Sequence, residues 1–235
     1  MGQCDLVLLH APNFHVMNEA AGEALTLDIH VRTKVRYDYS YIESAVVRLG
    51  EDTLQVDSYG GYFLNGVSGA SLPAMLSGFP VTHIQPDDKQ HFFTIELGPG
   101  EDLVLSAFKD MVSVKVDNAD ESRFHGSAGL MGEFDGQRRL LGRDGVRVIP
   151  EPNSLGEEWQ VRDDEDMLFQ VSRSPQYPKK CIFPDAAAAK KSRRLGHSVA
   201  RKVAEKACSH WKENKMACIN DVMKTGDVDL AGAHF

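Results

Sequence analysis

Apolar and polar residues alternate along much of the first 120 residues, and the clearest example is the stretch 25–35. Its apolar side chains fall on one side of an extended chain, and most of its polar side chains fall on the other. The charged side consists of Asp28, His30, Arg32 and Lys34. Because successive side chains of a β-strand point to opposite faces, this stretch predicts a strand with one buried face and one solvated face.

The same alternation recurs in short stretches that are separated by residues typical of turns. These stretches are 44–50, 53–58, 92–98, 101–108 and 111–117. Turn signals such as Gly60-Gly61 and Gly98-Pro99-Gly100 lie between them. Many short strands without intervening helices are typical of an antiparallel sandwich or barrel. We therefore predict a mainly β fold, an antiparallel two-sheet β-sandwich over residues 1–160.

The alternation ends after residue 150. Asn153 or Ser154 is expected to cap a short turn that ends near Trp159, because short polar side chains accept hydrogen bonds from the first N–H groups of a helix. The following stretch is acidic and then broken by prolines. We predict that residues 161–180 form a linker.

Helical patterns dominate the C-terminal part. Asp185 is a plausible cap for a helix over 185–213, in which apolar residues recur at helical spacing. This stripe consists of Leu195, Val199, Val203, Ala207 and Trp211. A second short helix is expected at about 216–224, ending near Thr225-Gly226. Residues 181–235 thus predict a small α-helical appendage.

The chain carries 34 acidic and 26 basic side chains, a formal net charge of −8. This balance argues against a nucleic-acid partner, since phosphate binding needs a basic surface. No apolar run reaches the ~18 residues of a membrane span, so no transmembrane segment is expected. The first residues contain no basic leader, so no signal peptide is expected in this chain. Basic residues at 190–206 indicate a solvated helix face or, alternatively, a phosphate- or membrane-binding face.

Motifs for catalysis are missing from the sequence. There is no HExxH pair, no P-loop and no complete dinucleotide-binding glycine motif. Ser68 in GVSGA and Ser127 in HGSAG each lack one glycine of the GxSxG nucleophile elbow. We therefore expect no enzyme, and a serine hydrolase that uses Ser68 or Ser127 with a histidine is kept as an alternative.

One glycine-rich acidic loop is a candidate for a metal site. It contains Glu133 and Asp135, and carboxylate oxygens are the ligands that calcium prefers. The spacing of an EF-hand loop is absent, and the arginines of the loop would repel a cation or pair with these acids. We expect no cofactor, and if calcium binds, its ligands are Asp135 and Glu133.

Four cysteines are spread over the chain without the CxxC spacing of a zinc cluster: Cys4, Cys181, Cys208 and Cys218. One interpretation is four buried thiols in a cytosolic protein. In the other, an antiparallel helix pair brings Cys208 and Cys218 within the separation that a disulfide spans. Cys4 and Cys181 would then be the two cysteines that remain to form a second disulfide.

Four motifs, in order along the chain, are similar to elements of one family. GQCDLVLL resembles a GxCxYVL strand, GLMGEFDG a GLCGNFDG signature, NSLGEEWQV a DPxxFGxSWxV exit and ACINDVMKTGD an ACxFDxCxTGD element. These are elements of the von Willebrand factor type D domain and of the eight-cysteine helical module that often follows it. The wording of residues 27–50 looks closest to versions of this domain in unicellular marine algae.

The resemblance implies two disulfides, Cys4–Cys181 and Cys208–Cys218, of which the first joins the first strand to the segment beyond the WxV exit. Met131 stands where the family has a cysteine whose partner lies in an upstream segment. That segment does not precede Gly2, so we expect that the first strand of the domain is missing and that Met131 is an apolar plug. Glu133 replaces the asparagine of NFDG, which implies a degenerate calcium loop.

By resemblance, the expected function is a non-catalytic interaction or adhesion module at the cell surface or outside the cell. Its partners would be other extracellular or matrix proteins, in protein assembly or matrix contacts, and the sequence leaves the oligomeric state open. A lipid- or small-ligand-binding domain is the alternative, because type D domains also occur in large lipid-transfer proteins. Met75, Leu76 and Phe79 favour this alternative unless they pack into the core.

Overall fold

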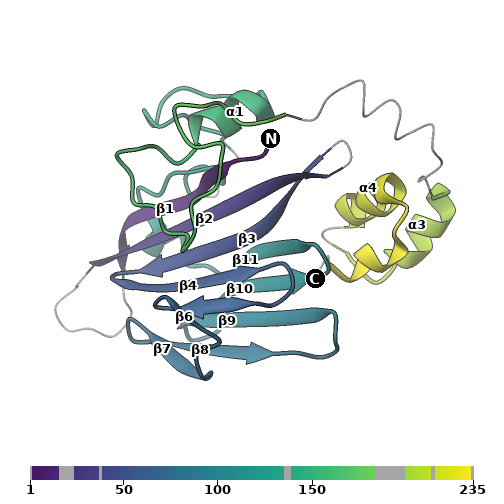
Figure 1. The fold of residues 1–235 in the computed structure, drawn as a ribbon, viewed down its shortest axis with the longest axis horizontal. Coiled ribbons are helices and arrows are strands. Elements are labelled where there is room, and N and C mark those ends of the chain that lie inside the picture. The colour runs from purple at the N-terminus through teal and green to yellow at the C-terminus, as the bar shows by residue number, and fades with distance from the viewer. Residues whose placement is uncertain are drawn as a thin grey trace.

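The computed structural model describes residues 2–15, 24–36, 39–134, 139–183, 199–212 and 215–233. It is mainly β, with two antiparallel sheets that share one apolar core and with short helices, most of them near the C-terminus (Figure 1). The predicted two-sheet sandwich with a small helical appendage is confirmed.

Each strand pairs with its neighbours in sequence, so both sheets are meanders. The six-stranded sheet has the order β1 (Asp5–His15), β2 (Ala24–Arg36), β3 (Tyr39–Leu49), β4 (Asp52–Asp57), β5 (Tyr62–Leu64) and β6 (Val67–Ser68). The five-stranded sheet has the order β11 (Met111–Asp117), β10 (Glu101–Phe108), β9 (Gln90–Gly98), β8 (Phe79–Ile84) and β7 (Ala74–Leu76). Two-residue turns join β3 to β4, β9 to β10 and β10 to β11. The β9–β10 turn and the β4–β5 connection contain the predicted turn residues Pro99-Gly100 and Gly60-Gly61.

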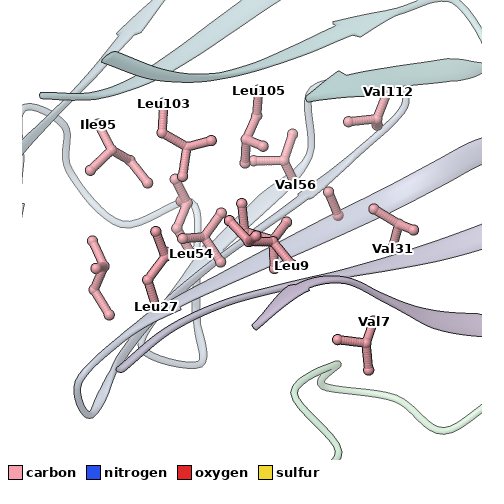
Figure 2. Close-up of a cluster of buried hydrophobic side chains, with 14 of the residues drawn as sticks. Val7, Leu9, Leu27, Val31, Leu54, Val56, Ile95, Leu103, Leu105 and Val112 are labelled. Atoms are coloured by element: carbon pink, nitrogen blue, oxygen red, sulfur yellow. The ribbon is translucent and has the colours of Figure 1, made fainter. Parts of the chain in front are cut away.

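The facing sides of the two sheets carry the apolar half of the alternation. Leu27, Ile29 and Val31 of β2 are fully buried, as predicted. Figure 2 shows side chains of the six-stranded sheet, such as Leu54 and Val56, close to Leu103 and Leu105 of the other sheet. Burial of each such side chain contributes about 1.5–3 kcal/mol, so this layer dominates the stability of the sandwich.

The opposite face of β2 is also buried, which the alternation did not predict. Asp28, His30 and Arg32 are only 2%, 6% and 9% exposed, so the expected solvated face is wrong for all three. Residues 139–183 lie over this face and exclude water from it. We call residues 139–183 the cover. Figure 2 shows Val7 on the same outer side of the sheet, beside a segment of the cover and away from Leu9.

The predicted linker 161–180 is the central part of the cover, where it packs closely on the sheet. Leu168 and Phe169 form a small buried cluster with Val46 of β3. The guanidinium of Arg32 stacks over the Phe169 ring at 4.3 Å and donates to both carboxylate oxygens of Asp5 at 2.7 and 2.8 Å. A sequence stretch that is acidic and rich in proline can therefore be ordered when it satisfies charges on a sheet.

The outer edge of β1 is paired by three irregular segments of the chain. Gln3 bridges Ile182, Leu6 bridges Gln160 and His10 bridges Ala128. This pairing satisfies backbone groups that an open sheet edge would expose. The edge strand of the sheet is thus covered by segments more than 100 residues away in sequence.

The backbone geometry at Gly129 explains why the GLMG motif begins with glycine. Its φ is +138°, and a Cβ atom there would lie 2.5 Å from the carbonyl oxygen of Leu8. Only glycine lets the two backbones approach so closely. The next residues continue the pairing, since the N–H of Met131 donates to the same Leu8 oxygen at 3.1 Å. The side chain of Met131 is 40% exposed, so the prediction of an apolar plug is wrong.

Helix α1 (Pro152–Glu158) begins two residues earlier than a cap at Asn153 would allow. Glu151 is the cap residue and makes no side-chain cap hydrogen bond, while Asn153 and Ser154 lie inside the helix. Proline is favoured in the first turn because its missing N–H would be unpaired there in any case. The helix ends at Trp159, as predicted.

The C-terminal elements form a second, smaller core against the end of β10. They are α3 (Arg201–Ala207), α4 (Lys215–Thr225) and the 3-10 helix η2 (Val228–Ala233). Another 3-10 helix, η1 (Glu121–Phe124), precedes the cover and packs its Phe124 into the main core. Figure 1 shows α3 and α4 beyond the ends of β10 and β11. Helix α4 confirms the prediction for 216–224.

The predicted helix 185–213 is only partly described. Residues 184–198 lie outside the described residues, and within the rest the helix begins at Arg201. Ala204 and Cys208 form its buried face, whereas Val203 is exposed, so the predicted apolar stripe is wrong at Val203. Trp211 donates its indole N–H to the carbonyl of Ala231 at 2.6 Å.

Candidate functional site

Both disulfides that the sequence analysis named are present. The Cα atoms of Cys4 and Cys181 are 5.2 Å apart, and those of Cys208 and Cys218 are 5.9 Å apart. Cys4 begins the six-stranded sheet and Cys181 lies near the end of the cover. The first disulfide therefore closes a loop that contains the whole sandwich and fastens the cover to it.

The calcium loop shows no metal arrangement in its described part. Glu133 forms an ion pair with Arg139 at 3.3 Å, which matches the alternative that these acids pair with neighbouring arginines. Asp135 lies outside the described residues. Across the part of the chain that the structure describes, no group of three or more His, Cys, Asp or Glu side chains could hold a metal ion.

The two candidate serine nucleophiles have no histidine base beside them among the described residues. The buried hydroxyl of Ser127 accepts a hydrogen bond from the N–H of Phe134 at 2.9 Å. Ser68 is exposed on the short edge strand β6, opposite Phe63. The structure gives Ser127 a structural partner and brings neither serine into a catalytic arrangement.

The residues that favoured lipid binding have ordinary positions. Leu76 and Phe79 pack in the core, and Met75 is exposed on the short strand β7. Much of the basic stretch 190–206 lies outside the described residues, and its described cations Arg201, Lys202 and Lys206 are exposed. None of the described helices is long and apolar enough to cross a membrane.

A row of polar side chains on the outer face of the sheet was missed by sequence reasoning. The strand register places His10 opposite Asp28 and Asp28 opposite Arg48, so the three form one cross-strand row. His10 Nδ1 lies 2.5 Å from one oxygen of Asp28, and Arg48 donates to the other at 2.5 Å. Arg48 also donates to Asp166 of the cover at 2.5 Å. The row therefore links three strands to the cover.

A cavity of about 230 Å³ lies between this row and the cover. His30 lines it, and its Nδ1 has no hydrogen-bond partner among the described residues. Burial lowers the pKa of His30 to about 4, so this ring is neutral at pH 7. The hydrogen bond to Asp28 instead raises the pKa of His10 above its ordinary value. Burial would raise the pKa of Asp28, but the hydrogen bonds from His10 and Arg48 hold it below its ordinary value.

The cover is also tied to itself around Arg143. This guanidinium donates to the carbonyls of Glu158 and Gln160 at 2.8 and 3.0 Å, pairs with Glu165 and stacks over the Trp159 ring at 4.8 Å. Trp159 in turn donates its indole N–H to Leu141 at 2.8 Å. Most charged groups around the cavity thus pair with one another, and the Arg48–Asp166 pair joins the cover to the sheet.

A groove with a volume of about 570 Å³ lies on the cover. It lies between α1 and the segments 147–150 and 177–180. Its apolar lining includes Val148, Pro150, Tyr177 and Pro178. Val148 is 57% exposed and Tyr177 is 42% exposed, so both side chains present apolar surface to solvent inside the groove.

Ion pairs and the nearby disulfide fix the walls of this groove. Arg147 pairs with Glu158 at 2.8 Å, and Lys180 pairs with Glu157 at 3.0 Å. The side chain of Gln160 donates to the carbonyl of Lys179 at 2.9 Å, one residue before Lys180 and two before Cys181. The groove therefore has a mixed lining, in which a few apolar side chains lie among charged and polar ones.

Comparison with known proteins adds no relative. No protein-family model matches the chain, and no curated protein has a similar sequence. The assignment to a von Willebrand factor type D domain therefore stays a prediction.

Proposed function

We propose that this chain is a non-catalytic protein-interaction module of the oxidising extracellular or cell-surface environment, which contacts its partner through the groove beside α1. The observation that carries the proposal is the exposure of Val148 and Tyr177 in a groove whose walls are fixed. Pockets of about 300–1,000 Å³ accept a small ligand or a short segment of a partner. Exposed apolar surface with a polar rim marks interaction sites.

The two disulfides support the proposal that the chain resides in an oxidising extracellular or cell-surface environment. Disulfides persist in secreted and cell-surface proteins and are rare in the cytosol. Cys4–Cys181 also keeps the groove preformed, which lowers the ordering cost of binding. The described charged groups near the cavity are paired with one another and serve to hold this surface.

The partner can be sought with a photo-crosslinking residue in place of Val148. The oxidised protein that carries this residue is incubated with the extracellular fraction of its source cells and then irradiated. The crosslinked protein is identified by mass spectrometry, purified and titrated by calorimetry. Tyr177→Ala should weaken this binding about tenfold or more, as loss of a buried aromatic anchor does. Val171→Ala is the control, because Val171 is 69% exposed, more than Tyr177 at 42%, but does not line the groove.

Two results would overturn the proposal. Alkylation of protein taken from its natural source would show four free thiols if the chain resides in a reducing compartment. Equal affinities of Tyr177→Ala and the unaltered chain for the crosslinked partner would mean that the groove is not the contact.

A further inference from the structure

Two histidines from neighbouring strands meet at the inward side of the five-stranded sheet. His83 lies on β8, opposite Phe93 of β9, and His91 lies two residues before Phe93. All three side chains therefore share one face of the sheet. His83 Nε2 and His91 Nδ1 share a hydrogen bond at 3.1 Å, and both rings are only partly buried.

The position of both rings is fixed by their surroundings. The His83 ring lies parallel to Phe93 at 4.3 Å and nearly parallel to His91 at 5.3 Å, so the three rings form a column. Tyr62 of β5 contacts this column from the other sheet, with its ring 5.9 Å from that of His83.

The turn between β4 and β5 closes over His91. A Cβ atom on Gly60 would lie 2.4 Å from the His91 ring, so only glycine permits this approach. The side chains are thus held in place before any ligand arrives, while their partial exposure leaves room for water on the remaining side.

This spacing fits two nitrogens on one metal ion. Zinc binds histidine nitrogen at about 2.0–2.1 Å, so two nitrogens 3.1 Å apart can bind one ion with an angle of roughly 100° between the bonds. One of these nitrogens donates its N–H to the other, so a metal ion would bind both by displacing this single shared proton. Neutral imidazole is a preferred ligand of copper, nickel and zinc.

We propose that His83 and His91 form a two-histidine site for a divalent transition-metal ion, with Cu²⁺ bound more tightly than Zn²⁺. No third His, Cys, Asp or Glu of the described chain completes a protein cage around it, so water fills the other positions. The order of affinities follows the general preference of nitrogen sites for Cu²⁺. A bound ion links β8 to β9 where the β4–β5 turn meets them, at a distance in sequence from the cover and its groove.

The test is a Cu²⁺ titration of the oxidised full chain at pH 7.5, followed by calorimetry and by electron paramagnetic resonance. One ion per chain with two coordinated nitrogens is expected. His83→Gln and His91→Gln should each weaken binding by about tenfold or more, since loss of even a supporting group costs 10–100-fold. His125→Gln is the matched control, because His125 is exposed and lies outside the column.

Further readouts separate a site from a folding defect. Without metal, each glutamine variant should keep the circular dichroism spectrum of the unaltered chain. Saturating Cu²⁺ should raise the melting temperature of the unaltered chain and of His125→Gln, but not that of the His83→Gln,His91→Gln double variant. Lowering the pH to 5.0 should weaken binding, because protons compete for both rings. The proposal fails if the double variant binds Cu²⁺ as tightly as the unaltered chain, or if His125→Gln weakens binding equally.

Discussion

Because His30 is buried and neutral, we predict that the folded chain loses stability in mild acid and that protonation of this one residue causes the loss. In the folded chain its pKa is about 4, whereas an unfolded histidine titrates near 6.5. Between these values the unfolded chain binds a proton that the folded chain does not, so stability falls as the pH falls. Integration of this difference gives about 2 kcal/mol between pH 7.5 and 5.0 and about 3 kcal/mol in full.

The assay is urea unfolding at pH 7.5 and 5.0 for the unaltered chain and for His30→Phe. Phenylalanine keeps a ring in the site and leaves no nitrogen without a partner. Asp5, Asp28 and Glu165 favour protonation of His30 and Arg48 opposes it, but these groups are the same in both proteins. The unaltered chain should therefore lose about 2 kcal/mol more than the variant over this pH range.

A direct titration checks the cause of this difference. Nuclear magnetic resonance should give a pKa near 4 for His30 and, in the same spectra, a pKa above 6.5 for His10. If His30 titrates near 6.5, or if both proteins lose the same stability, the assignment of a buried neutral ring beneath the cover is refuted.

Three further predictions concern the elements that hold the cover and the edge of the sheet. Replacing Asp28 by Asn should destabilise the fold by about 3 kcal/mol in urea unfolding, because Arg48 loses a buried partner. The same change should lower the pKa of His10, and an unchanged pKa would contradict the hydrogen bond between His10 and Asp28. Gly129→Ala should destabilise the fold by more than Gly126→Ala, by about 1–3 kcal/mol, because only at Gly129 does the new Cβ meet a backbone oxygen, and equal melting temperatures would count against this contact. Removal of the Cys4–Cys181 disulfide by serine substitutions should cost about 2–5 kcal/mol and speed hydrogen exchange at Gln3 and Ile182, whereas removal of Cys208–Cys218 should leave that exchange unchanged.

The strands were predictable because their information is local. The alternation over 25–35 and over 101–117 reflects the geometry of an extended chain, and turn residues mark where it reverses. Burial of one apolar face follows directly from this pattern. For the same reason α4 was predicted within one residue at each end, since its apolar positions repeat at helical spacing.

The sites were not predictable from such patterns. Asp28, His30 and Arg32 were correctly placed on one face of a strand. A polar face predicts exposure to solvent, and the strand's own sequence does not show that another segment covers it. What covers it is a segment more than 100 residues later in sequence, which looks like a linker. Its apolar anchors, such as Leu168 and Phe169, show no periodicity because residues 161–180 form neither helix nor strand.

The sequence by itself thus determined the two-sheet architecture and placed Asp28, His30 and Arg32 on one face of a strand, because both depend on which side of a strand each residue occupies. The tertiary structure alone decided the burial of His30, the groove beside α1 and the meeting of His83 with His91. These features depend on which distant segments come together. No local pattern of side chains records such a meeting, because it results from the packing of the whole chain.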